Sequence, residues 1–329
     1  MARSIGTSLA VPNAALAPDG NALAFEPLGW AHLAAWLGKV QALAADRNAL
    51  PPEVAAALDE IKALAAGFGG PAQLGTQARA ATLPSLPYVG LVWLVERLHA
   101  LAQETHALLL ALGAPGNAVA RRDTLARLNA LTVRARDLGS PLLPLLSQFR
   151  AEVLPASAAM ALAVGTLGQT LQQSWEAVGA QQATLQRLED ELKRTSVVHP
   201  VKRRELSKQI DAARHTLAGL TAQAEALRLR VAALQDIVDE AVWLDASIGA
   251  LTDFVQKLRA AWASFGTALT QLDVEVAEAQ LQDPAWIAQQ LALDQALPRW
   301  QALIDAVARF QPAPAAATVQ AQQGRKVQL

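Results

Sequence analysis

Hydrophobic residues recur every seven positions through the second half of the chain. Steps of seven residues that begin at Leu206 meet only apolar side chains as far as Val276. A second apolar column follows four residues later, and beyond Ala241 it follows three residues later. Two apolar columns at this spacing are typical of helices that pack in a coiled coil. The pattern selects these seam residues: Leu206, Ile210, Leu217, Leu220, Leu227, Val231, Leu234 and Trp262.

The shift of the second column near Ala241 predicts that the contacting face of the helix rotates there. We interpret this point as the place where a two-helix stalk enters a thicker bundle. A continuous helix over 202–280 would be roughly 115 Å long at 1.5 Å per residue. A sphere of this mass would be only ~45 Å across, so a helix of that length must project from it.

A short turn precedes this pattern and returns the chain. Pro200 disfavours helix at His199 and ends the helix before it. The preceding segment from Pro141 to Arg194 can stay helical, apart from a kink or brief break at Pro155. The sequence therefore predicts an all-α fold, in which an elongated helical bundle head carries a long antiparallel coiled-coil hairpin stalk.

Proline and glycine punctuation divides the rest of the chain into shorter helices. We expect a helix after Pro27, another after Pro52, a third over 88–112 and a fourth that Asn117 caps. The expected organisation is as follows: a flexible N-terminal tail over 1–26, N-terminal helices of the head over 27–140, the hairpin stalk over 141–245 with its tip near 195–203, C-terminal helices that complete the head over 246–310, and a disordered tail over 311–329.

Composition supports a helical protein and excludes several functions. Hydrophobic residues make up 52% of the chain, mostly the strong helix formers alanine and leucine. The formal net charge is -1, and the chain has a single tyrosine, which together disfavour binding to nucleic acid. Cysteine is absent, so disulfides, thiolate nucleophiles and cysteine-based metal sites are excluded.

No constellation of residues points to catalysis. His99 and His106 could share a helix face, but the HExxH spacing of zinc proteases is absent. The glycines over 67–70 follow no strand and do not form a phosphate-binding loop. We therefore expect no catalytic residue, no cofactor and no metal, and expect that the protein is not an enzyme.

The turn between the long helices combines exposed apolar residues with positive charge. Its candidate membrane-contact residues are Val197, Val198, His199, Val201, Lys202, Arg203 and Arg204. Basic side chains beside exposed valines suit anionic lipid headgroups. The alternative is that these charges keep an exposed turn soluble and favour the C-terminal end of the preceding helix.

Two stretches lack charged side chains: 80–95 and 153–175. The second is long enough to span a bilayer. We favour a helix buried inside a bundle, because this stretch also contains Pro155, two glycines and several Gln, Ser and Thr residues. The N-terminus carries no evident secretory signal, since Pro12, Pro18 and Asp19 interrupt any apolar stretch.

The arrangement of short helices, long hairpin and the following segment LRAAWASFGTALTQLDVEVAEA resembles the α-helical pore-forming toxins of the cytolysin A superfamily. The similarity is greatest to subunits of xenorhabdolysin-type binary and haemolysin BL-type tripartite toxins. It implies a protein secreted without a Sec signal, which assembles with one or two homologous toxin subunits and perforates the membrane of a target cell as a hetero-oligomer. No catalysis, cofactor or nucleic acid is implied.

One feature departs from that family. Many members carry a hydrophobic tongue between the two long helices, whereas this chain has only the short basic turn near Val197. The departure favours a component that needs a partner subunit to insert.

Two other interpretations remain open. The same heptads would suit a non-toxic coiled-coil scaffold or adaptor that oligomerises through its stalk. A third and weaker hypothesis is a helical enzyme around His99 and His106 in the N-terminal bundle.

Overall fold

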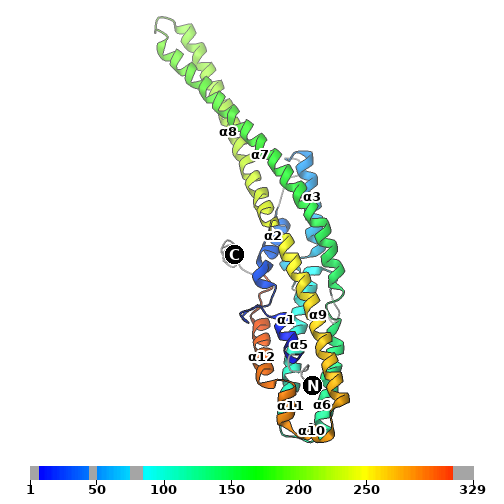
Figure 1. Ribbon diagram of the computed structural model, residues 1–329. Coiled ribbons are helices and arrows are strands. Elements are labelled where there is room, and N and C mark those ends of the chain that lie inside the picture. Colours follow the sequence, from blue (N-terminus) through cyan, green and yellow to red (C-terminus); the bar gives the residue numbers. More distant parts are fainter. Residues whose placement is uncertain (1–6, 44–49, 75–83, 314–329) are drawn as a thin grey trace. The chain divides into compact units, whose positions relative to one another are not determined.

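The computed structural model describes residues 7–43, 50–74 and 84–313, and it is helical (Figure 1). The described residues hold no β-strand beyond an isolated bridge between Leu16 and Leu23. The predicted all-α fold, with a helical bundle and a long antiparallel hairpin, is therefore confirmed. The chain forms two compact units. Unit 1 comprises 1–43, 62–154 and 240–329, and unit 2 comprises 44–61 and 155–239.

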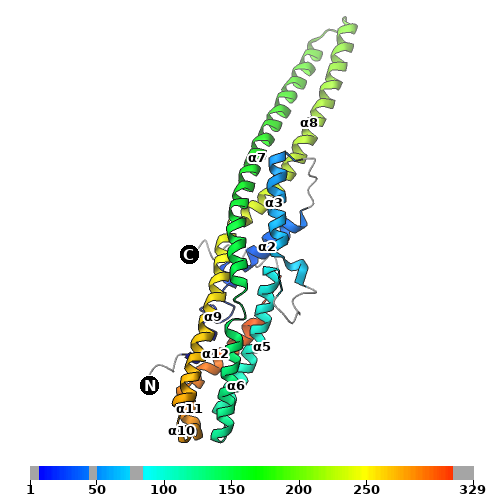
Figure 2. The same ribbon diagram turned by 90° about the vertical axis from the view of Figure 1, so that its right-hand side faces the viewer.

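Unit 1 is a bundle in which segments far apart in the sequence pack together (Figure 2). Helix α9 lies against α6, α1 and α2, while α5 lies against α12, α6 and α11. The elements that belong wholly to unit 1 are η1 (Thr7–Leu9), α1 (Ala10–Ala15), η2 (Glu26–Leu28), α2 (Trp30–Ala42), η4 (Pro71–Gln73), α5 (Pro87–Gly113), α6 (Ala118–Arg136), α9 (Leu244–Glu275), α10 (Glu278–Gln282), α11 (Pro284–Gln290) and α12 (Leu293–Arg309).

Local signals in the sequence explain several of these helix ends. Pro87 opens α5, where its missing N–H costs nothing. Asn117 caps α6, and its side-chain Oδ1 accepts a hydrogen bond from the Ala120 N–H at 2.8 Å. The predicted helices over 88–112 and after Asn117 are thus present.

Aromatic side chains fill the core of unit 1. Trp262 packs against Trp300 with 5.7 Å between ring centroids, and the Trp300 indole N–H donates to the Ser8 carbonyl. Trp30 stacks on Tyr88 at 4.8 Å between centroids. Because each ring buries a large apolar area, these contacts account for much of the bundle's hydrophobic stabilisation.

Unit 2 is built from parts of three helices: α3 (Pro52–Phe68), α7 (Leu142–Arg194) and α8 (Pro200–Ala241). Within it, α7 and α8 run antiparallel, joined by the turn over 195–199 (Figure 1). The α7 segment from Pro155 to Arg194 is roughly 60 Å long at 1.5 Å per residue. Helix α7 continues through Pro155 without the brief break that the sequence allowed.

The single long helix expected over 202–280 is interrupted. Helix α8 ends at Ala241, and α9 begins at Leu244 after a turn at Val242 and Trp243. The interruption lies where the second apolar column shifts from four to three residues. The second long helix also ends earlier than expected, at Glu275, because the backbone of Val276 is extended.

Residues 7–26 do not form the flexible tail expected from the sequence. Thr7–Leu9 and α1 are helical, and Val11, Ala15, Leu23 and Phe25 are fully buried. Helix α1 thus packs against α9 and α12 rather than facing water. At the other end, Gln311 and Pro312 accept hydrogen bonds from the Trp30 indole and the Tyr88 hydroxyl. The expectations for 1–6 and 314–329 lie outside the described residues.

Candidate functional site

The hairpin tip in unit 2 exposes three valines. Val197, Val198 and Val201 are 80%, 79% and 82% exposed, and His199 is exposed as well. The turn cannot bury them, because it is only long enough to reverse the chain between α7 and α8. Three adjacent valines in water are unfavourable, which marks the tip as a surface suited to an apolar or interfacial environment.

Two of the tip's cations have partners on α7 or directly after it. Lys202 lies 3.1 Å from Glu191, and Arg203 donates to the Thr195 carbonyl at 2.9 Å. Arg203 thereby satisfies a carbonyl at the C-terminal end of α7, where positive charge is favourable. These contacts give Lys202 and Arg203 a structural role, while Arg204, three residues after Val201, is exposed.

The seam residues fall into three groups. Leu206, Ile210 and Leu234 are buried, whereas Leu217, Leu220, Leu227 and Val231 are half-buried. Trp262 is also buried, but it belongs to the aromatic core of unit 1. Polar contacts add to the seam at Gln181, which donates to the Ala213 carbonyl at 3.2 Å, and at Arg214, which lies 2.8 Å from Glu189.

The uncharged run over 153–175 lies on α7. The most apolar 18-residue window of α7 as a whole has a mean hydropathy of 1.4, and 33% of that window is buried. The buried side includes Met160, Val164 and Leu167, whereas Leu162 is 76% exposed. Packing in a bundle, the interpretation favoured from sequence, therefore accounts for one side of this helix only.

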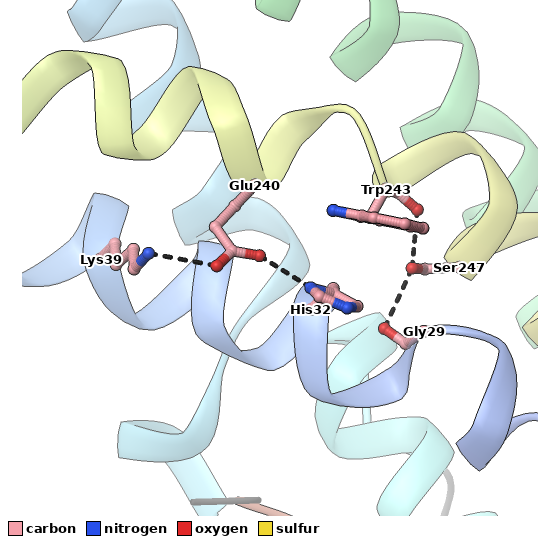
Figure 3. Close-up of polar contacts among 6 residues, drawn as sticks. All are labelled: Gly29, His32, Lys39, Glu240, Trp243 and Ser247. Carbon is pink, nitrogen blue, oxygen red and sulfur yellow. Dashed lines mark hydrogen bonds and ion pairs between the residues drawn. The ribbon is translucent and has the colours of Figure 1, made fainter. Parts of the chain in front are cut away.

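A buried polar cluster in unit 1 lies where α8 gives way to α9 (Figure 3). His32 Nδ1 lies 2.9 Å from Glu240 Oε2, and Lys39 Nζ lies 3.2 Å from Glu240 Oε1. His32 and Glu240 are buried, at 1% and 6% exposure. With a hydrogen on Nδ1, the imidazole donates to the carboxylate, so the buried acid is both paired and hydrogen-bonded.

The same cluster holds the turn between the two helices. The Trp243 ring stacks on His32 with 4.7 Å between centroids (Figure 3). Ser247 Oγ lies 2.7 Å from the Trp243 carbonyl and 3.0 Å from the Gly29 carbonyl. Gly29 has a φ of 133°, and a Cβ there would lie 2.2 Å from Ser247 Oγ, so only glycine permits this approach.

Sequence reasoning missed this cluster. Glu240 lies outside both apolar columns, one residue before Ala241, so the pattern gave no signal that its side chain is buried. Its partner His32 lies 208 residues away, so no local pattern could connect them.

The histidines considered for catalysis lie on α5 and are half-buried. His99 Nε2 lies 3.1 Å from Gln103 Nε2, one helical turn away. Within residues 7–43, 50–74 and 84–313, no group of three or more His, Asp or Glu side chains is arranged to hold a metal ion.

Comparison with known proteins identifies the fold through structure only. No protein-family model matches the sequence, and no curated protein sequence matches it significantly. Among solved structures, the chain resembles the pore form of SmhB from the tripartite α-pore-forming toxin Smh of Serratia marcescens. The TM-score is 0.61 at 10% identity, over 89% of this chain and 99% of SmhB.

Two further structures show weaker similarity. Soluble SmhB aligns with a TM-score of 0.49 at 11% identity, over 97% of this chain and 98% of that one. Soluble AhlC, from the tripartite toxin AHL of Aeromonas hydrophila, aligns with a TM-score of 0.47 at 13% identity, over 85% and 95%. Of these three structures, the pore form of SmhB has a TM-score above 0.5. This chain therefore shares its fold with that subunit of a tripartite α-pore-forming toxin.

Proposed function

We propose that this protein is a subunit of a multi-component α-pore-forming toxin. It is secreted, assembles with one or two homologous subunits and perforates the membrane of a target cell. The observation that carries the proposal is the fold shared with the SmhB pore form over nearly the whole chain. The proposed activity has no catalytic step, because a pore-forming subunit acts by assembly alone.

We further propose that the hairpin tip makes the first contact with the membrane. Val197, Val198 and Val201 supply apolar area, and Arg204 supplies a positive charge beside them. Transfer of one valine from water into the interface stabilises the bound state by about 1.5 kcal/mol, and a basic residue near anionic lipid adds ~1 kcal/mol. Arg203 and Lys202 hold the turn in shape through their contacts with α7.

The seam of the hairpin suits a subunit that exchanges partners. Leu217, Leu220, Leu227 and Val231 are only half-buried in unit 2, so they retain apolar surface for another helix. One coiled-coil contact can then replace another at a small net free-energy change. This supports hetero-oligomerisation through the hairpin.

Dye release from vesicles and lysis of red cells test the proposed activity. The protein is assayed alone and mixed with long-helix proteins encoded beside it, on vesicles of phosphatidylcholine and phosphatidylglycerol. Leakage or lysis in at least one mixture is expected. A complete lack of leakage, lysis and vesicle binding in every mixture would leave the coiled-coil scaffold as the better interpretation.

Val198→Asp tests the tip, with Val274→Asp as the matched control. Val274 is also 80% exposed, but it lies on α9. We expect Val198→Asp to weaken vesicle binding roughly tenfold or more, because it removes apolar area and adds a charge that anionic lipid repels. Equal binding by both variants would exclude the tip as the contact surface.

A further inference from the structure

The two limbs of the hairpin differ in chemistry along the part of unit 2 that lies away from the tip. On α7, no charged side chain occurs between Glu152 and Glu176. The charged residues of α8 from Leu220 to Asp239 are Glu225, Arg228, Arg230, Asp236 and Asp239. The contacts of Gln181 with Ala213 and of Arg214 with Glu189 fix the antiparallel register. The same register, continued away from the tip, places residues 155–175 of α7 alongside this charged part of α8.

The length of the uncharged run matches a bilayer. Residues 153–175 span roughly 35 Å as a helix at 1.5 Å per residue. The hydrocarbon core of a bilayer is ~30 Å thick. Charged residues lie directly beyond both ends, at Glu152 and Glu176, and Trp175 lies at the boundary, where an interfacial aromatic ring is favourable.

Three of the four hydroxyl groups in the run are satisfied inside the helix, whereas the buried Ser157 Oγ has no hydrogen-bond partner. Thr166, Thr170 and Ser174 each donate to the carbonyl four residues earlier, at 3.2, 3.2 and 2.9 Å. Such bonds lower the cost of placing these three hydroxyl groups in hydrocarbon, since each of them already donates to a carbonyl. The glutamines cluster in the last turns beside Trp175, at the end nearest the interface.

The exposed side of the run is available in unit 2. Leu162, near the middle of the run, is 76% exposed although α3 lies beside it. The groove between α3 and α7 is shallow and largely apolar, and it is lined by Glu53, Ala56, Ala57, Glu60, Ala159, Leu162, Ala163 and Thr166. Helix α3 therefore covers this side of α7 incompletely.

We infer that residues 153–175 of α7 are the segment that crosses the bilayer, with the charged face of α8 turned to water. This inference rests on the proposed toxin function and identifies the part of the chain that contacts lipid hydrocarbon. Its partner is the acyl interior of a bilayer, because the run has the length and lack of charge that this environment requires. The tip, which makes the first contact, then lies beyond the opposite membrane surface once the subunits have assembled, by roughly 30 Å at 1.5 Å per residue from Glu176.

Fluorescent labelling at single cysteines tests the inference directly, because the natural chain has no cysteine. An NBD probe is attached at Leu162→Cys, and separately at Leu229→Cys as the control. Leu229 is 61% exposed on the charged limb of the same unit. In a subunit mixture that permeabilises vesicles, the probe at 162 is expected to shift to the blue and to be quenched by lipids with a nitroxide deep in the acyl chain. The probe at 229 is expected to remain accessible to aqueous iodide.

Charge substitution provides the functional readout. Leu162→Asp is expected to lower vesicle leakage roughly a hundredfold, since a charge at the centre of a bilayer is strongly unfavourable. Leu229→Asp is expected to leave leakage within about twofold, because α8 already carries charge there. Circular dichroism should show that both variants fold, because both side chains are exposed.

The outcomes separate the two proposals. The inference would be overturned if vesicles leaked while the probe at 162 stayed in water or was quenched only by shallow nitroxides. The proposed toxin function would still hold in that case. Equal leakage by Leu162→Asp and the natural chain would also overturn it. Absence of leakage and of vesicle binding in every mixture would remove the toxin function and the inference together.

Discussion

The two units of this protein bury their hydrophobic residues in different ways. Unit 1 packs tryptophan, phenylalanine and tyrosine rings from distant segments into a shared core, as at Trp262 and Trp300. Unit 2 relies on a two-helix seam of leucine, isoleucine, valine and alanine, in which Leu220 and Leu227 are only half-buried. A residue in a bundle is covered from several sides, whereas a residue in a two-helix hairpin is covered from one. The bundle is therefore suited to hold its structure and the hairpin to change its contacts.

The largest effect is expected for Trp262→Ala in unit 1. Trp262 is 1% exposed and packs against Trp300 and Phe265. Removing a buried indole leaves a cavity that the surrounding rings cannot fill, so the free energy of unfolding should fall by about 3–5 kcal/mol. Urea unfolding followed by far-ultraviolet circular dichroism measures the change.

Leu227→Ala in the hairpin seam is the control for that comparison. Truncation of this half-buried leucine should lower the free energy of unfolding by about 1 kcal/mol, because much of its surface is already in water. If Leu227→Ala destabilised the protein as much as Trp262→Ala, the proposed contrast between the two units would be wrong.

The sequence predicted the hairpin better than the bundle, and the reason lies in the range of the contacts. Pro200 and the apolar columns at seven-residue spacing are local signals, and they located α8 and the turn before it. The folded N-terminal segment was missed, because Val11 and Phe25 become buried only through contacts with α9 and α12, far away in sequence. The interruption at Trp243 was visible only as a shift of the second column, since no proline or glycine marks it.

Some features of the candidate site could be predicted from the sequence, and others could not. The exposed tip follows from its position at a turn that a few residues must complete. The roles of Arg203 and Lys202 could not be predicted, because they depend on where the end of α7 lies. The uncharged run on α7 was evident from the sequence, but its exposure depends on how little of it α3 covers.

An intermediate effect is expected for Glu240→Ala at the junction of α8 and α9. The substitution leaves the buried His32 without its partner and removes the ion pair with Lys39. Loss of a buried, hydrogen-bonded acid should lower the free energy of unfolding by about 2–3 kcal/mol. Glu240→Gln should cost less, because an amide oxygen can still accept a hydrogen bond from His32.

Glu225→Ala is the matched control, since Glu225 lies on the same helix and pairs with Arg228 at 2.7 Å in unit 2. The side chains of Glu225 and Arg228 are both substantially exposed, so Glu225→Ala should lower the free energy of unfolding by less than about 1 kcal/mol. Hydrogen exchange at Trp243 and Leu244 gives a second readout, and it should increase in Glu240→Ala only. Equal costs for the two alanine variants would mean that the buried cluster does not hold the junction.

The smallest effect concerns pH and Glu26, which lies at the start of η2 in unit 1. Burial raises the pKa of the Glu26 carboxyl, while the hydrogen bond from the Leu23 N–H and the charge of Arg309 act in the opposite direction. A folded-state pKa above the unfolded value means that the folded state holds the proton more tightly. This group therefore favours folding fully below the unfolded pKa, near 4.3, and the contribution is lost as pH rises through the folded pKa. Glu26→Gln removes that titration, so the stability of the natural chain relative to the variant should decline as pH rises from about 4 through the folded-state pKa of Glu26. Urea unfolding of both proteins across this range measures the difference, and a constant or rising difference would show that burial does not control this carboxyl.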